Sequence, residues 1–224
     1  MIAMTHTLID ALSAPDSSTR LRAALAAGTA PATTDTTVVD ELVRRSSVEP
    51  DFFVRDMLTW AITRQAAALT VPRVVAELDS PAPQARSQAL HTLSKLGDRA
   101  VYQRVAALLH DRDDEVARTA WRTAVTLVSE EGAPDLAAEL VTELGRGDHE
   151  VRRSLSRALA ELGTAAEDAL AVAASSNSEA VRVHALATRR LLADPDADFS
   201  AAVEQARRAA TLQGAPIEHP DAHR

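Results

Sequence analysis

Arginines and tryptophans at helical spacing are the residues of this sequence best suited to chemistry. Two arginine pairs are four residues apart, Arg118 with Arg122 and Arg153 with Arg157, so each pair lies on one face of a helix. Guanidinium groups donate charge-assisted hydrogen bonds, and indoles such as Trp60 offer a large contact area. These residue types indicate a surface that binds an anionic partner.

The composition predicts an all-α protein. Hydrophobic residues make up 46% of the 224 residues, aromatic residues only 3%, and there are seven glycines. A core of Ala, Leu and Val with few glycines for sheet turns is typical of helices. The absence of cysteine excludes disulfides and thiolate metal sites. No apolar run reaches the roughly 18 residues of a membrane helix, so we expect a soluble, cytoplasmic protein without a membrane partner.

The charge disfavours binding to duplex DNA. The net charge is −8, and the acidic excess lies entirely within residues 113–224. A protein that neutralises DNA phosphates usually shows the opposite balance. All the basic residues except Lys95 are arginines, which fits a coding bias, so arginine abundance alone is no evidence of binding.

The sequence contains a repeat of about thirty residues. Each copy has a polar or proline-containing turn followed by a small apolar residue, which stands at Val54, Ala85, Val116, Val151 and Val181. In four of these five copies the next residue is an arginine, namely Arg55, Arg86, Arg152 and Arg182. A fainter copy has Leu21 and Arg22 at these two places. We expect these arginines to pair with aspartates at the helix starts.

Each repeat predicts a helical hairpin, because a shorter helical stretch precedes each of these segments. Asp51, Asp113 and Asp148 stand where an N-cap is wanted. The pattern D-x-x-V-R at Asp51 to Arg55 and at Asp148 to Arg152 resembles HEAT repeats, over roughly residues 5–194. That resemblance implies a right-handed α-solenoid whose second helices line a concave side; armadillo-like stacking is the nearest competitor.

The predicted fold is therefore an all-α solenoid of about six HEAT-like helical hairpins and a C-terminal capping helix over residues 196–213. Residues 28–37 are expected to form a Thr-rich linker between the first two repeats. We expect a single domain over residues 1–213, followed by a flexible tail over residues 214–224.

Helical phasing separates a buried stripe from an open face. Counted from the small apolar residue, positions 4, 7, 8 and 11 form the stripe: Ala120, Thr123, Ala124 and Leu127 in one repeat, and Leu155, Ala158, Leu159 and Leu162 in the next. Positions 2, 6 and 9 lie nearly opposite and are expected to face the concave side. This face includes Asp56, Trp60, Ser87, His91, Arg118, Arg122, Arg153, Arg157, Val183 and Ala187, with Trp121 beside it.

Phe53, Met57 and Trp60 form a second apolar line on their helix, away from Val54 and Leu58. A helix that is apolar on two sides is usually covered on both. Either the protein itself buries this line, or the line is a hydrophobic docking strip.

No catalytic, cofactor or metal site is predicted. The HEAT-like deoxyhypusine hydroxylases bind iron through His-Glu pairs on successive repeats, whereas this sequence has only His149-Glu150, in a turn. Asp56, Trp60 and Trp121 resemble the residues that HEAT-like alkylpurine DNA glycosylases place in their groove, but the first three repeats lack the strongly basic groove of those enzymes.

The sequence thus predicts a non-catalytic binding or scaffold module whose concave surface docks a protein or peptide, or another anionic macromolecule. The predicted contact set is Trp60, His91, Arg118, Trp121, Arg122, Arg153 and Arg157, together with Phe53 and Met57. The alternative is a nucleic-acid-binding or glycosylase-like DNA-repair solenoid, which the net charge disfavours. A third hypothesis is a small-molecule sensor with Phe53, Met57 and Trp60 around an apolar pocket.

Overall fold

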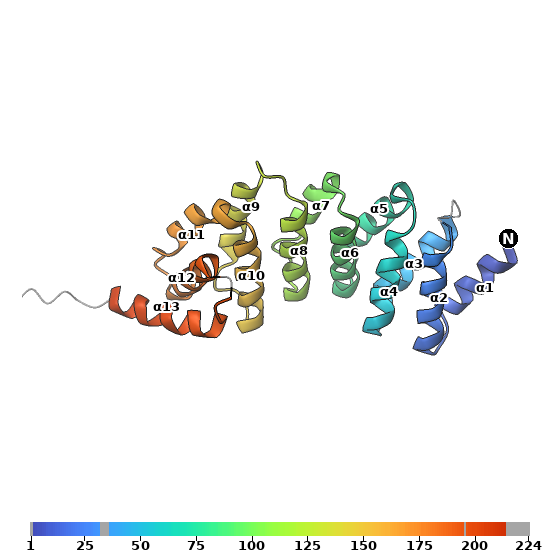
Figure 1. The fold of residues 1–224 in the computed structure, drawn as a ribbon, viewed down its shortest axis with the longest axis horizontal. Helices are drawn as coiled ribbons and strands as arrows, with labels where there is room; N and C mark the ends of the chain where they lie inside the picture. Colours follow the sequence, from blue (N-terminus) through green and yellow to red (C-terminus); the bar gives the residue numbers. More distant parts are fainter. Residues whose placement is uncertain (1, 32–35, 195, 214–224) are drawn as a thin grey trace, which may run out of the picture. The chain divides into compact units, whose positions relative to one another are not determined.

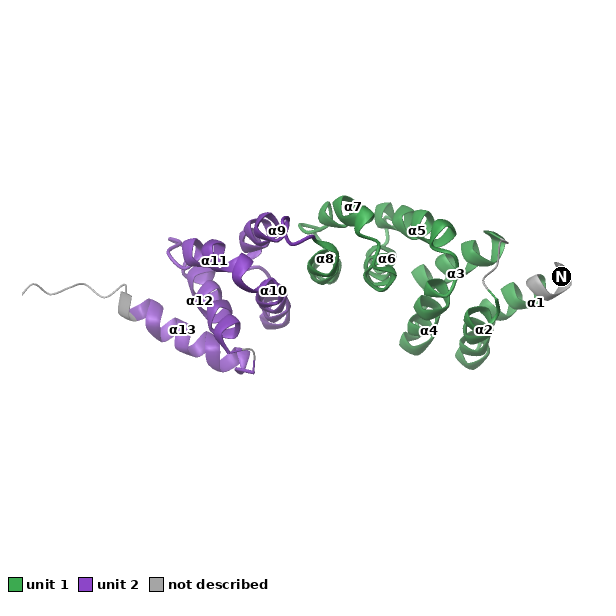
Figure 2. Cartoon of the chain, turned by 45° about the horizontal axis from the view of Figure 1, so that its top comes forward, with its two compact units in different colours: residues 1–128 green, residues 129–224 purple. Residues whose placement is uncertain are grey.

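The computed structural model describes residues 2–31, 36–194 and 196–213, and within them every regular element is a helix. The chain divides into two compact units, Met1–Val128 and Ser129–Arg224 (Figure 2). The predicted single domain over residues 1–213 stays a prediction. The predicted tail and residues 32–35 of the predicted linker lie outside the described residues, while α2 continues through Gly28 and Thr29.

Unit 1 consists of helical hairpins stacked one after another (Figure 1). The second helices of the pairs pack in sequence, α2 on α4, α4 on α6 and α6 on α8. The helices of this unit are α1 (Ile2–Leu12), α2 (Ser17–Thr29), α3 (Thr36–Val48), α4 (Phe52–Thr63), α5 (Ala67–Ala76), α6 (Pro83–Leu96), α7 (Tyr102–Ala106) and α8 (Asp114–Leu127).

Unit 2 repeats this arrangement and ends with one further helix. Helix α10 packs on α12, and α13 packs on α12 in turn. Its helices are α9 (Ala133–Leu140), α10 (His149–Glu161), α11 (Glu167–Ala173), α12 (Glu179–Ala193) and α13 (Phe199–Gln213). Each unit is therefore a stack of helical hairpins, the α-solenoid arrangement that the repeat predicted.

The predicted caps and the predicted buried stripe are both present. The side chains of Asp51, Asp113 and Asp148 accept hydrogen bonds from backbone N–H groups of the first turns of α4, α8 and α10. All four stripe residues of α8 are buried. In α10 three of the four are buried, and Leu162, just beyond the helix end, is half-buried. Local sequence thus determines where the second helices of these pairs begin and which side they bury.

The arginine that follows the small apolar residue ties its helix to the preceding loop. Nη1 of Arg55 donates to the carbonyl oxygens of Glu49 and Pro50, at 2.8 and 2.9 Å. Arg86 and Arg182 bind the carbonyls five and six residues before them in the same way. The predicted pairing with cap aspartates is therefore wrong for these three arginines: Arg55 binds carbonyl oxygens, and the caps of α6 and α12 are Ala82 and Ser178, which have no carboxylate.

In the first repeat the arginine with this role is Arg20, not Arg22. Nη1 of Arg20 donates to the carbonyls of Ala14 and Pro15, which lie six and five residues before it. Asp16 caps α2 three residues before Thr19, as Asp51 caps α4 before Val54. The predicted register, with Leu21 at the apolar position, was two residues too late.

Candidate binding surface

A groove of about 600 Å³ lies within unit 1, on one side of α4, α6 and α8. Helix α6 contributes the largest share of its lining, and α4 and α8 flank α6 on either side (Figure 1). The lining residues are Phe52, Arg55 and Asp56 from α4, Pro83, Gln84, Ser87, Gln88 and His91 from α6, and Asp113, Glu115, Thr119 and Arg122 at or in α8.

Two members of the predicted contact set, His91 and Arg122, line this groove. They occupy equivalent places, six residues after Ala85 and Val116. Asp56 and Ser87, which the same phasing placed on the open face, line it as well. The phasing thus finds part of a real depression, although whether the solenoid is concave on this side stays a prediction.

The guanidinium of Arg122 is positioned by the hydroxyl of Thr119, which is itself held by hydrogen bonds. Oγ1 of Thr119 donates to the carbonyl of Glu115 at 2.8 Å and lies 3.0 Å from Oγ of Ser87 on α6. Nη2 of Arg122 in turn donates to Oγ1 of Thr119 at 3.2 Å. This connection joins α6 to α8 and holds a cation at the groove wall.

His91 is half-buried in the groove and is favoured in its neutral form. Burial lowers its pKa, and the positive charges of Lys95 and Arg122 lower it further, while Asp56 acts in the opposite direction. The imidazole is therefore a neutral hydrogen-bonding group beside a guanidinium at neutral pH.

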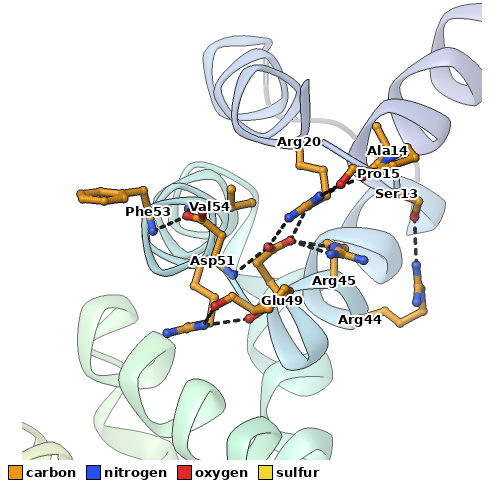
Figure 3. A network of polar contacts seen from close by, with 12 residues as sticks. Ser13, Ala14, Pro15, Arg20, Arg44, Arg45, Glu49, Asp51, Phe53 and Val54 are labelled. Carbon is orange, nitrogen blue, oxygen red and sulfur yellow. Dashed lines mark hydrogen bonds and ion pairs between the residues drawn. The ribbon is translucent and has the colours of Figure 1, made fainter. Parts of the chain in front are cut away.

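An exposed aromatic pair stands at the start of α4. The rings of Phe52 and Phe53 meet edge to face, with centroids 5.6 Å apart, and Phe52 lines the groove. Phe53 is 72% exposed and points away from the neighbouring helices (Figure 3). Of the two predicted alternatives for the line of Phe53, Met57 and Trp60, complete burial by the protein itself is wrong at Phe53.

Trp60 and Met57 do not line this groove. The Trp60 ring packs against α2, where Gly28 leaves room for it: a Cβ atom at Gly28 would lie 2.2 Å from Cζ3 of the indole. The residue stays 37% exposed, and Met57 is half-buried. Trp60 therefore combines packing with exposure, and its role in binding stays a prediction.

The placement of Trp121 beside the open face is wrong. Trp121 is fully buried, and its Nε1–H donates to the carbonyl oxygen of Leu109 at 2.9 Å. Its repeat has Ala117 where other repeats have the loop-binding arginine. The indole ties the helix to the preceding segment in its stead, and it is excluded from any contact surface.

The remaining arginines of the predicted set are distributed over both units. In unit 1, Arg118 pairs with Glu115 at 3.2 Å and does not line the groove. In unit 2, Arg153 and Arg157 line a separate pocket of about 610 Å³, whose lining also includes Glu161, Asp196 and Asp198. That the four arginines converge on one surface stays a prediction.

The predicted open face of the last repeat is buried. Val183 and Ala187, which the phasing placed on that face, are 8% and 0% exposed. The apolar side of α13 covers them through Phe199, Ala202 and Ala206. This prediction was wrong because the next helix along the chain, α13, packs on this side of α12.

The phasing missed several groove residues. Gln84, Gln88 and Thr119 are neutral polar residues that no pattern distinguishes from ordinary surface positions. Phe52 had a signal in the sequence, because it is an aromatic residue directly after the cap aspartate Asp51. The structure shows that it is exposed. Arg55 was predicted only to pair with a cap aspartate, although it lines the groove.

Neither a metal-binding cluster nor a membrane-spanning helix is present in the described ranges. No three His, Cys, Asp or Glu side chains gather there in a way that could hold a metal ion. Likewise, none of the helices in those ranges is long and apolar enough to span a membrane.

The chain is similar in backbone arrangement to solved repeat proteins. It matches an engineered protein with a TM-score of 0.47 and 20% identity, over 94% of this chain and 97% of that one. A designed armadillo repeat protein matches with a TM-score of 0.43 and 20% identity, over 83% and 98%. A chain of the complex of CpcE and CpcF of phycocyanin lyase from Nostoc sp. matches with a TM-score of 0.35 and 18% identity, over 92% and 94%. No protein-family profile and no curated protein matches the sequence.

Proposed function

We propose that this chain is a non-catalytic binding module that takes a segment of a protein partner into the groove between α4, α6 and α8. The observation that supports the proposal best is the groove itself, about 600 Å³ in volume and built on three successive helices. Sites on packed helices are held more rigidly than sites on loops, so little ordering accompanies binding.

The lining suits a polypeptide. An aromatic ring from Phe52, the amides of Gln84 and Gln88, and charges of both signs offer apolar contact together with many hydrogen bonds. Nucleic acid fits less well, because Asp56, Asp113 and Glu115 also line the groove and would repel phosphates.

A groove-filling substitution tests this function. Asp56 is exposed and lines the groove, so Asp56→Trp places a bulky ring in it without breaking a core contact. Gln103→Trp places the same ring on the exposed surface of α7. The probe is a displayed library of random dodecapeptides, from which binders of the full chain are selected and their Kd values measured.

We expect Asp56→Trp to weaken the binding of the selected peptides at least about tenfold, a loss of roughly 1.4 kcal/mol in binding free energy. Gln103→Trp should leave their Kd values unchanged. Equal affinity for both variants, or salt-sensitive retention of oligonucleotides in place of peptides, would overturn the proposal.

A further inference from the structure

We infer that His91 and Arg122 form a carboxylate subsite, which holds an aspartate or glutamate side chain of a bound peptide. This inference rests on the proposed function and names what one end of the groove recognises. The two side chains line the same groove from adjacent helices, and the positive charge of Arg122 acts on His91.

Unlike the neighbouring Arg118 and Arg86, Arg122 has no carboxylate partner in the described part of the chain. Arg118 pairs with Glu115, and Arg86 with Asp111. The hydrogen bond of Arg122 to Thr119 uses one of the five N–H donors of a guanidinium. Since Arg122 is exposed and lines the groove, the remaining donors are open to a ligand.

Thr119 prepares this guanidinium for an incoming anion. Its hydroxyl is anchored to the Glu115 carbonyl and lies within hydrogen-bonding distance of Ser87. The side chain of Arg122 therefore loses less freedom on binding than an unanchored arginine would. Planar, forked donors match a carboxylate in two parallel hydrogen bonds.

His91 adds a proton-linked contact. The groups that face it are Lys95 on its own helix, Arg122 on α8 and Asp56 on α4. Burial and the two cations disfavour the imidazolium in the free protein, and a carboxylate bound between His91 and Arg122 offsets both effects. Binding therefore takes up a proton, so affinity rises as the pH falls from 7.5 to 6.0.

The surrounding acids limit the subsite to a single negative charge. Asp56, Asp113 and Glu115 line the same groove. A phosphate group carries about two charges at pH 7 and would meet stronger repulsion than a carboxylate. The side chain of an acidic residue is therefore the ligand chemistry that fits best.

Three peptide libraries with identical random flanks test the subsite. Their central residue is fixed as glutamate, glutamine or phosphoserine. We expect the full chain to retain the glutamate library about tenfold better than the glutamine library, as one charge-assisted contact implies. Arg122→Gln should abolish this preference. Arg64→Gln, at an exposed arginine at the end of α4, should keep it.

A titration of His91 provides a second readout. The NMR signal of its ring proton is followed against pH with and without a selected glutamate peptide. We expect the pKa of His91 to rise on binding in the wild-type chain and to stay unchanged in Arg122→Gln.

The outcomes separate the two proposals. Equal retention of the glutamate and glutamine libraries, with binding still lost in Asp56→Trp, would overturn the carboxylate subsite and leave the binding groove intact. A preference for phosphoserine would likewise overturn it. Retention of none of the libraries would overturn the proposed function, and the subsite with it.

Discussion

The two units hold their helices together in chemically different ways. At two of the three junctions between hairpins in unit 1, a buried arginine forms a two-pronged ion pair with an acidic residue of the next hairpin. Arg20 donates to both oxygens of Glu49, at 2.8 and 2.7 Å (Figure 3), and Arg86 donates to both oxygens of Asp111, at 2.9 and 3.0 Å. Each acid stands five residues before the small apolar residue of its repeat and also accepts a backbone N–H from the cap aspartate.

Unit 2 has no acid at the equivalent place. The residue five positions before Val181 is Ser176, whose hydroxyl accepts the N–H of Ser178. Arg152, which corresponds to Arg86, has no ion-pair partner within the described residues, and its Nε is buried without a hydrogen-bond partner there. A neutral network between α10 and α12 stands where an ion pair would be expected.

His184 is the centre of this neutral network and is 2% exposed. Its Nδ1 accepts the backbone N–H of Gly145 at 3.0 Å, so the ring proton is on Nε2. Nε2 lies 3.0 Å from both Oγ of Ser156 and the Arg152 carbonyl, and Ser156 lies 2.7 Å from Oγ1 of Thr188. A second proton on Nδ1 would point at the Gly145 N–H, so the network requires a neutral imidazole.

The difference teaches that one repeat pattern can be joined by charge or by neutral hydrogen bonds, with opposite demands on protonation. Burial alone would raise the pKa of Glu49, but Arg20, the Asp51 N–H and Arg45 outweigh it and lower the pKa to about 2. Burial lowers the pKa of His184 to about 4; the hydrogen bond to the Arg152 carbonyl acts in the opposite direction, and the charge of Arg152 lowers the pKa further. Unit 1 thus needs a charged group, and unit 2 an uncharged one.

The largest expected effect comes from removing the charge of Glu49. Glu49→Gln leaves the buried Arg20 and the half-buried Arg45 without a counter-charge, so we expect the free energy of unfolding to fall by about 3–5 kcal/mol. Urea denaturation monitored by circular dichroism measures it. Glu204→Gln, in an exposed pair with Arg207, serves as the control and should change stability by less than about 0.5 kcal/mol.

A loss below about 1 kcal/mol in Glu49→Gln would contradict the view that unit 1 depends on buried charge. The contrast between the units would then be one of sequence alone.

The second prediction concerns acid stability. The folded pKa of His184 is depressed from 6.5 to about 4, so its stabilising contribution is present above pH 6.5 and is lost as the pH falls toward 4. The loss is about 3 kcal/mol. The contribution of Glu49 is present above pH 4.5 and is lost only as the pH falls toward 2. Between pH 7 and 4.5, the protection factors of the backbone amides, which correct exchange for its intrinsic pH dependence, should therefore fall more in α10 and α12 than in α2 and α4.

Two variants sharpen this comparison. His184→Gln should flatten the pH dependence in α10 and α12, whereas His149→Gln, at an exposed position, should leave it unchanged. The same test in a His91→Gln background removes a histidine of unit 1 whose pKa is also lowered. An equal fall of the protection factors in both units would show that the protonation of His184 does not determine the acid stability of unit 2.

The sequence predicts the features that depend on neighbours along the chain. The cap aspartates act on N–H groups two or three residues away, and the buried stripe follows from helical geometry, so both were predictable. Arg20 was missed because Thr19 breaks the apolar pattern on which the register was based. The partner of that arginine, Glu49, lies 29 residues further along the chain.

The features that depend on packing between helices could not be predicted from local periodicity. Trp121 is buried and donates to the carbonyl of Leu109, twelve residues before it, a contact that no periodicity reveals. Val183 and Ala187 occupy open-face positions, yet α13 covers them. In the groove, the phasing identified His91 and Arg122 because their helices pack regularly, but it also included Trp60, whose ring lies against α2.

An apolar contact in unit 1 should show a smaller effect than its ion pairs. At Gly28→Ala the new Cβ would lie 2.2 and 2.6 Å from two Trp60 carbons and 3.0 Å from Cα of Ala61. We expect a net loss of about 1–3 kcal/mol from overpacking, despite the helix propensity of alanine, which favours the variant by about 1 kcal/mol. Thermal unfolding measures it, and Trp60→Ala in the same chain should recover part of the loss. A stabilised Gly28→Ala variant would show that the indole moves aside freely.

The smallest expected effect separates arginines that hold the fold from the one assigned to binding. Arg86→Gln removes a buried pair with Asp111 and should lower the free energy of unfolding by about 3 kcal/mol or more. Arg122→Gln removes an exposed guanidinium. The Thr119 hydroxyl loses one hydrogen bond but still donates to the Glu115 carbonyl, so the free energy of unfolding should change by no more than about 0.5 kcal/mol. Both are measured in urea, at pH 7 and in the same buffer. If Arg122→Gln cost as much as Arg86→Gln, its guanidinium would belong with the ion pairs of unit 1, because a side chain that stabilises the free protein that strongly is not left open for a ligand.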